Sequence, residues 1–262
     1  MLSRNQIKYY SSLRQKKSRI AHGVFLAEGD KMVRELLADP GEIYKPRNLL
    51  ALPEFLEKCK RPGKINTLVI NEKELGRISS LSSPNKALLE INIPDYSWSA
   101  SDIEHEYSFY LENIQDPGNL GTIIRTADWF GIRNIFLSEE SVDLYNPKAI
   151  QSTMGSFARV KVHYIKPEEF FQEPKKLPSS YLSIATALNG ENIYKAKLGT
   201  CGIFLFGNES RGLSKKTSDH ADITISIPGS ENNKGAESLN LSTAVGIIGA
   251  EIIRRKTIQN GS

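Results

Sequence analysis

The second half of the chain alternates short hydrophobic runs with amphipathic segments. Six runs of four to six residues lie at 107–111, 134–137, 160–165, 182–185, 203–206 and 223–227. Helical spacing of apolar residues follows most of them, and the last such segment, 239–256, carries Leu241, Ala244, Val245, Ile248 and Ile252 on one face. Uninterrupted hydrophobic strands that alternate with helices are typical of a parallel sheet covered on both sides. The pattern predicts an α/β fold with a mostly parallel sheet.

The first ninety-five residues show a shorter alternation of the same kind. Strands are predicted at 24–27, 67–70 and 87–91, and helices at about 7–13, 31–38, 53–59 and 72–78. The stretch from residue 93 to 106 is rich in Pro, Ser and acidic residues and has neither strand nor helix periodicity, which indicates a linker. We therefore expect a small α/β/α domain at 1–95, a linker at 96–106 and a larger domain at 107–262.

Composition narrows the class of protein. Hydrophobic residues make up 39% and charged residues 24% of the chain, as in ordinary globular proteins. There is no apolar run of transmembrane length, and residues 1–6 lack the apolar core of a signal peptide. Two cysteines, Cys59 and Cys201, are too few for a disulfide framework or a Cys-rich zinc site. The four histidines have no metal-ligand spacing, so we expect a protein that uses no metal. With few cysteines, no signal peptide and no membrane segment, we expect it to be cytoplasmic.

Positive charge is concentrated at the start of the chain. Residues 1–95 hold 17 Lys and Arg against 11 Asp and Glu, whereas residues 96–262 hold 17 against 19. The first twenty residues contain six basic side chains and no acidic one. Phosphate contacts require such side chains, so this segment predicts a nucleic-acid surface, with Arg14, Lys16, Lys17 and Arg19 as candidates. The alternative is a solvated helix face without a partner.

The larger domain lacks the common α/β cofactor signatures: the dinucleotide-binding glycine motif, the phosphate-binding loop and the serine-hydrolase elbow. Polar, glycine-bearing segments instead follow three of its predicted strands, at 113–128, 204–213 and 227–245. Open α/β sheets bind ligands at this edge. Each segment alone has a structural explanation: a turn with a helix cap, a strand-to-helix loop, or the N-terminus of the last helix. Three capping-type side chains in the third segment, Ser238, Asn240 and Ser242, exceed what one helix needs.

Taken together and in order, these segments resemble the three signature motifs of the SpoU (TrmH-like) family of SPOUT methyltransferases. The matching stretches are 116–127 (DPGNLGTIIRTA), 206–213 (FGNESRGL) and 238–244 (SLNLSTA), and 151–156 (QSTMGS) is similar to a family segment between the first two. Residues 23–29 and 33–37 resemble the L30e-like RNA-binding domain that often precedes this catalytic domain. The resemblance therefore spans nearly the whole chain.

The resemblance implies an RNA 2'-O-ribose methyltransferase that uses S-adenosylmethionine, works as a homodimer and has a C-terminal trefoil knot. Knots are nearly absent from proteins, so pattern reading alone would have predicted an unknotted chain. The family's cofactor site falls, by position, on motifs two and three. It comprises Gly207, Glu209, Ile227, Ser238, Leu239 and Asn240.

A sulfonium methyl donor is already electrophilic, so the difficult step is deprotonation of the ribose 2'-hydroxyl as it attacks. A positioned cation would stabilise the developing alkoxide. Arg125 matches the family's candidate, as proton acceptor or as electrostatic stabiliser; an arginine is almost always protonated, which favours the second role. Asn119 is expected to orient Arg125 or the ribose, and Ser238 and Asn240 to help position the reacting groups.

This chain departs from the family pattern at two places. Ser210 stands where motif two usually has glycine, and the loop 228–238 is about three residues longer than usual. We expect rRNA rather than tRNA as substrate, because a separate N-terminal domain is present. A tRNA methyltransferase and an RNA-binding protein that has lost catalysis are the alternatives.

Overall fold

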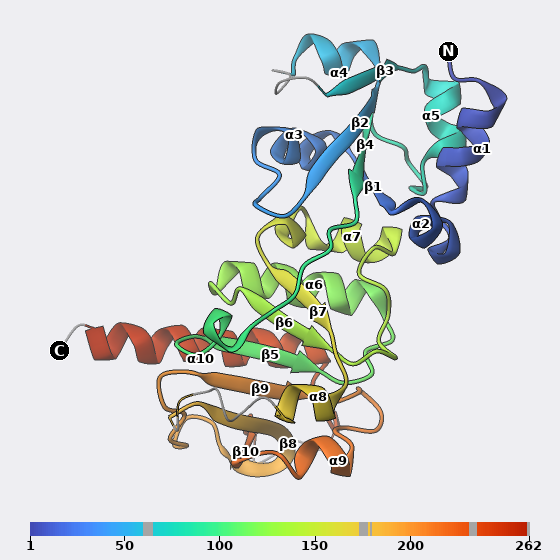
Figure 1. Cartoon of the computed structure of the whole chain (residues 1–262). Coiled ribbons are helices and arrows are strands. Elements are labelled where there is room, and N and C mark those ends of the chain that lie inside the picture. Colours follow the sequence, from blue (N-terminus) through green and yellow to red (C-terminus); the bar gives the residue numbers. More distant parts are fainter. Residues whose placement is uncertain (60–64, 173–177, 179, 231–234, 261–262) are drawn as a thin grey trace. The chain divides into compact units, whose positions relative to one another are not determined.

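The chain forms two compact units in the computed structural model, which describes residues 1–59, 65–172, 178, 180–230 and 235–260. The first unit combines Met1–Tyr96 with Asp143–Arg159, and the second combines Ser97–Val142 with Val160–Ser262. Figure 1 shows the course of the chain through each unit. The domain limits expected from the sequence place residues 143–159 with the larger domain, so the two divisions differ at this segment.

The first unit is built on a four-stranded sheet with the order β1-β4-β2-β3. Strand β4 is antiparallel to both β1 and β2, while β2 and β3 are parallel. Its strands are β1 (Val24–Glu28), β2 (Lys45–Ala51), β3 (Asn66–Val69) and β4 (Ala87–Asn92). Its helices are α1 (Arg4–Ser12), α2 (Lys16–His22), α3 (Asp30–Ala38), α4 (Pro53–Glu57), α5 (Glu72–Ile78), α7 (Pro147–Thr153) and the 3-10 turn η2 (Ser156–Ala158).

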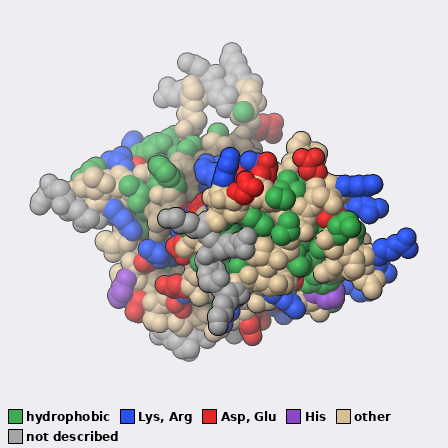
Figure 2. Space-filling view, turned by 90° about the horizontal axis from the view of Figure 1, so that it is seen from above, with side chains coloured by type: hydrophobic (Ala, Val, Ile, Leu, Met, Phe, Trp, Pro, Cys, Tyr) green, Lys and Arg blue, Asp and Glu red, His purple; other side chains and the backbone are tan. Residues whose placement is uncertain are grey.

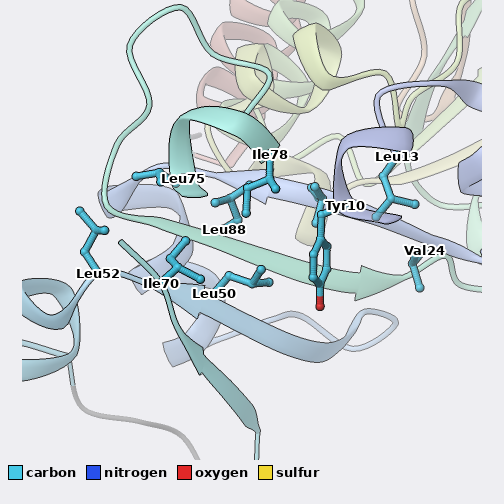
Figure 3. Close-up of a cluster of buried hydrophobic side chains, with 10 residues drawn as sticks. Tyr10, Leu13, Val24, Leu50, Leu52, Ile70, Leu75, Ile78 and Leu88 are labelled. Carbon is cyan, nitrogen blue, oxygen red and sulfur yellow. The ribbon is translucent and has the colours of Figure 1, made fainter. Parts of the chain in front are cut away.

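Local sequence explains where two of these helices begin. Ser3 and Gln6 form a reciprocal capping box at the start of α1, and Asn71 and Glu74 form another at the start of α5. Both helices then place apolar side chains over one face of the sheet. Figure 3 shows Tyr10 of α1, Leu13 directly after that helix, and Leu75 and Ile78 of α5 around Leu50 and Leu88. This cluster is the core of the first unit on that face.

Strand β2 was not among the predicted elements. It begins with polar residues and contains Pro46, a residue that central strands exclude because it cannot donate to the ladder. The structure accommodates Pro46 next to an irregularity in the pairing with β4, where the register shifts between Pro46 and Asn48. The bulge allows a central strand to carry a proline.

The second unit contains a six-stranded sheet with the order β10-β8-β9-β5-β6-β7, in which every neighbouring pair is parallel. Its strands are β5 (Tyr107–Leu111), β6 (Asn134–Leu137), β7 (Lys161–Tyr164), β8 (Leu182–Asn192), β9 (Gly202–Phe206) and β10 (Ile223–Ser226). Its helices are η1 (Ala100–Asp102), α6 (Pro117–Trp129), α8 (Pro167–Gln172), α9 (Lys215–Ser218) and α10 (Leu241–Asn260).

The predicted fold class is confirmed: a mostly parallel α/β sheet and a small N-terminal α/β domain are both present. The central strands β5, β6 and β9 are buried along their whole length, as expected for strands covered on both faces. None of the helices in the described ranges is long and apolar enough to cross a membrane. The trefoil knot stays a prediction, because the approach to α10 includes residues 231–234, which lie outside the described residues.

Candidate active site

Asn119 links all three motifs through its side chain. Its Nδ2 donates to Glu209 Oε1 of motif two at 2.9 Å, and its Oδ1 accepts from Asn240 Nδ2 of motif three at 3.2 Å. The parallel sheet explains how they meet, since Asn119 follows β5 and Glu209 follows the adjacent β9 at the carboxyl edge. The structure therefore brings together three of the predicted site residues.

The start of α6 leaves the Asn119 side chain available for these contacts. Asp116 is the N-cap, and its carboxylate accepts from the Asn119 backbone N–H at 2.8 Å. Pro117 occupies the first helical position, where its fixed φ is favourable and no N–H is needed. Asp116 and not Asn119 therefore caps the helix, and the Asn119 side chain bridges the loops of motifs two and three.

Motif two folds back on itself directly after β9. Asn208 and Gly212 exchange backbone hydrogen bonds of 3.1 and 2.8 Å, and the Asn208 side chain accepts from the backbone N–H groups of Ser210 and Arg211. A Cβ on Gly207 would lie 2.0 Å from the carbonyl carbon of Gly212. The group that approaches Gly207 closely is therefore the chain's own backbone. Ser210, the departure from the family pattern, is exposed in this turn.

Motif three supplies both a helix cap and an exposed edge. Asn240 Oδ1 accepts from the Ser242 backbone N–H at 2.9 Å, as an N-cap of α10, while its Nδ2 reaches Asn119. Ser238 is exposed, and the apolar side chain of Leu239 is 48% exposed. Ile227, at the end of β10, is half-buried. Within the loop 228–238, residues 231–234 lie outside the described residues, so its conformation stays open.

Arg125 is exposed on α6 and is not bonded to Asn119. Six residues correspond to about 600° of helix rotation and about 9 Å along the axis, so the two side chains leave different faces. No described side chain pairs with its guanidinium. Asn119 was expected to orient Arg125 or the ribose. Its side chain bonds to Glu209 and Asn240 and not to Arg125, so orienting the ribose is the role that stays a prediction. Trp129, one turn further along the same face, is 84% exposed.

A cavity of about 560 Å³ is lined in part by residues of motif two. It is lined at the carboxyl edge of the sheet by residues of both charges, among them Glu112, Asn113, Ser138, Glu140, Asn208, Arg211 and Lys216. None of the predicted catalytic or cofactor-binding residues lines it. Close to Glu112 and Glu140, burial raises the pKa of Tyr110, so this phenol stays protonated. The cavity is thus separate from the hydrogen-bonded group of Asn119, Glu209 and Asn240, which we call the Asn119 junction.

The basic N-terminal residues differ in their surroundings. Arg19 is only 3% exposed, donates to the carbonyls of Leu13 and Arg14, and forms an ion pair of 2.5 Å with Asp143. Its assignment to RNA binding is therefore wrong, because the guanidinium is engaged inside the first unit. Arg14 is exposed, although it donates to backbone carbonyls of residues 77 and 79.

Lys16 and Lys17 are exposed at the start of α2 and keep the predicted accessibility. On the face seen in Figure 2, Lys and Arg side chains (blue) stand among acidic and hydrophobic ones and do not form one continuous patch.

The described residues contain no group of three His, Cys, Asp or Glu side chains arranged to hold a metal ion.

Comparison with known proteins identifies the family. The model of the SpoU rRNA Methylase family matches residues 106–250, and that of the MRM3-like substrate binding domain matches residues 4–88. A putative RNA methyltransferase of the TrmH family from Porphyromonas gingivalis is 32% identical, with a TM-score of 0.86 over 97% of this chain and 99% of that one.

Two further relatives cover nearly the whole chain. The structure of an AdoMet-bound rRNA methyltransferase from Sinorhizobium meliloti is 30% identical, with a TM-score of 0.81 over 97% of each chain. The "23S rRNA (guanosine(2553)-2'-O)-methyltransferase RlmP" of Bacillus subtilis is 26% identical over 94% of this chain and 95% of its own length. The chain belongs to the SpoU rRNA methylase family.

Proposed function

We propose that this protein transfers the methyl group of S-adenosylmethionine to a ribose 2'-hydroxyl of rRNA. The relatives support this assignment, since one is named as a 23S rRNA 2'-O-methyltransferase and the structure of another holds AdoMet. The observation that carries it is the Asn119 junction: one side chain fastens Glu209 of motif two to Asn240 of motif three. Those are the two loops to which the resemblance assigns the cofactor.

The residues around the junction suit S-adenosylmethionine. Leu239 and Ile227 offer apolar surface for an adenine, and Leu239 is left half-exposed beside a polar cluster. The Glu209 carboxylate suits ribose hydroxyls or a cationic centre. Gly207 holds the motif-two turn closed against Gly212, which fixes where Glu209 projects. When bound, the cofactor supplies an electrophilic methyl group.

The protein's own contribution is to orient the ribose and to stabilise charge. We assign Arg125 to stabilising the alkoxide that forms as the 2'-hydroxyl loses its proton, because an arginine side chain is protonated at neutral pH and its guanidinium here is exposed and uncommitted. Asn119, Ser238 and Asn240 are assigned to holding the ribose and the loops in position. For the cofactor we propose contacts with Gly207, Glu209, Ile227, Ser238, Leu239 and Asn240.

We also propose that the protein works as a homodimer that covers one face of α6. Trp129 and Arg125 share that face, and the Trp129 indole, which is 84% exposed, is of the aromatic type enriched at protein interfaces. Helix α10, which packs against α6, adds exposed Ile253 and Ile258. Light scattering should give a dimer for the wild type and a monomer for Trp129→Asp; a wild-type monomer would contradict this part of the proposal.

The function is tested with purified protein, S-adenosylmethionine that carries a labelled methyl group, and rRNA from cells lacking the protein. We expect label in the RNA at one position whose ribose then blocks alkaline cleavage of the chain. Calorimetry with S-adenosylmethionine alone should show binding.

Two results would redirect the proposal. RNA binding without cofactor binding would indicate the RNA-binding protein that has lost catalysis. Label in tRNA and not in rRNA would indicate a tRNA methyltransferase; the names of the relatives reported above favour rRNA.

A further inference from the structure

Glu90 of β4 is a fully buried carboxylate that gathers polar side chains from two other elements, α1 and β2. Tyr9 donates to its Oε1 at 2.5 Å, Tyr10 donates to its Oε2 at 3.4 Å, and Asn48 Nδ2 donates to the same oxygen. The Arg47 guanidinium lies 3.9 Å from Oε1. Burial raises the pKa of both tyrosines, so they remain neutral donors. Figure 3 shows the Tyr10 oxygen at the rim of the apolar cluster rather than within it.

The bulge in β2 brings two consecutive side chains to this carboxylate. Asn48 pairs with Glu90 across the sheet and Pro46 pairs with Ile91, which leaves Arg47 as the extra residue. In a regular strand successive side chains point to opposite faces, so Arg47 and Asn48 could not both reach Glu90. A bulge re-aims a side chain, and such bulges are over-represented next to functional sites.

The contacts around Glu90 extend to exposed residues on both sides, through Asn48 to Asn66 and through Tyr9 to His22. Asn66 of β3 donates to Asn48 Oδ1 at 2.6 Å, and the exposed ring of His22 stands edge-to-face against Tyr9, with ring centres 4.9 Å apart. We call His22, Tyr9, Arg47, Asn48 and Asn66 the polar strip. Its members come from α1, α2, β2 and β3, and all lie in the first unit.

A structural role alone does not account for the strip. A buried carboxylate is costly, and well-packed apolar residues commonly replace such a charge without loss of stability. What Glu90 adds is orientation: it fixes two ring hydroxyls, an amide and a guanidinium on one surface. Arg47 remains 53% exposed, while His22 and Asn66 are exposed.

We propose that the polar strip binds an unpaired nucleotide of RNA. Aromatic rings offer stacking surfaces to any base, amides hydrogen-bond to base edges, and a guanidinium pairs with phosphate. A paired base would present neither its face nor its Watson–Crick edge, so the strip fits a loop or bulge and not a duplex. The net positive charge of residues 1–95 favours the same partner. This inference rests on the proposed action on RNA and adds the surface and the form of RNA it takes.

The test compares the full-length protein with three single variants, His22→Ala, Arg47→Ala and Asn66→Ala. Binding is measured by fluorescence anisotropy against a hairpin RNA with a randomised loop and against a blunt duplex with the same stem. Lys31→Ala is the matched control, because it removes one exposed charge from α3, outside the polar strip. Thermal melting verifies that each variant is folded.

We expect His22→Ala to bind the hairpin about tenfold more weakly, with duplex binding unchanged. Arg47→Ala should lower the slope of log K against log salt by about 0.7, the value for one single-strand phosphate contact. Asn66→Ala should reduce the preference for hairpin over duplex without changing that slope. Lys31→Ala should change neither the hairpin preference nor the slope.

Wild-type hairpin affinity and salt slope in all three variants would overturn the inference, as would an equal loss in Lys31→Ala. Calorimetry with S-adenosylmethionine on the same samples separates this outcome from failure of the proposed function. If the protein binds the cofactor and transfers methyl groups, but the strip variants bind hairpin RNA as the wild type does, only the inference is refuted. Strip-dependent hairpin binding without cofactor binding would refute only the proposed activity.

Discussion

Replacing Asn119 by Ala removes the two hydrogen bonds that fasten motif two to motif three. The bond to the Glu209 carboxylate is charge-assisted and the bond from Asn240 is neutral. Such bonds contribute about 0.5–3 kcal/mol each, and exposure to water places both near the lower limit. The loss is therefore about 1–2 kcal/mol of loop positioning. If the cofactor requires the positioned loops, its Kd should rise about 5- to 30-fold.

Global stability should not fall with it. The helix keeps its cap, because Asp116 accepts from the Asn119 backbone N–H and not from its side chain. Calorimetric titration with S-adenosylmethionine, together with thermal melting, separates the two effects. Asn119→Asp is the informative second variant: its carboxylate still accepts from Asn240 but faces Glu209 with like charge, so binding should be at least as weak as in the Ala variant. Wild-type cofactor affinity in Asn119→Ala at an unchanged Tm would refute the role given to this junction.

Three further predictions concern other parts of the second unit. Arg125→Ala should abolish nearly all methyl transfer while leaving cofactor affinity unchanged, and wild-type turnover would disprove its assigned role. Gly249→Ala should destabilise the protein by about 1–3 kcal/mol, because its Cβ would meet the Phe130 ring at 2.3 Å, whereas Gly246→Ala on the same helix meets nothing and should stabilise by about 0.5–1 kcal/mol; urea unfolding of both must give opposite signs. A hydrogen bond from Arg254 lowers the pKa of Glu251 from 4.5 to about 2. The contribution of this pair to the free energy of unfolding is therefore complete above pH 4.5 and is lost as the pH falls towards 2. Glu251→Gln should flatten the stability profile in that window, and an unaltered profile would count against the pairing.

The strands of the second unit could be predicted because burial on both faces makes them continuously hydrophobic. Predicted limits coincide with β5 and β6, and motif residues appear at the carboxyl edge where a parallel sheet places them. The proximity of Asn119 and Glu209 follows from that rule, because they come after adjacent strands; the arrival of Asn240 does not, because β10 lies three places from β5 in the sheet. The rule does not predict which atoms form hydrogen bonds. Asn119 could equally have capped α6, but in the structure Asp116 is the N-cap.

Features decided by distant partners escaped prediction. Arg19 is one of six basic residues in the first twenty, and its local sequence cannot reveal that Asp143, 124 positions later, buries it in an ion pair. Strand β2 was missed because Pro46 contradicts a central strand unless a bulge absorbs it. In both cases a tertiary contact overrides the local pattern.

Residues 143–159, which the first unit draws from the middle of the chain, limit how such a protein can be rearranged. Phe157 is fully buried, with its ring 5.5 Å from that of Phe25 and 5.0 Å from that of Tyr44. If residues 1–96 were exchanged by a single crossover after Tyr96, the Phe157 ring would lose both of these aromatic partners. An apolar side chain that is now fully buried would then be exposed to solvent. Any domain that replaces residues 1–96 must bring its own surface for Phe157, which ties the inheritance of the two segments together.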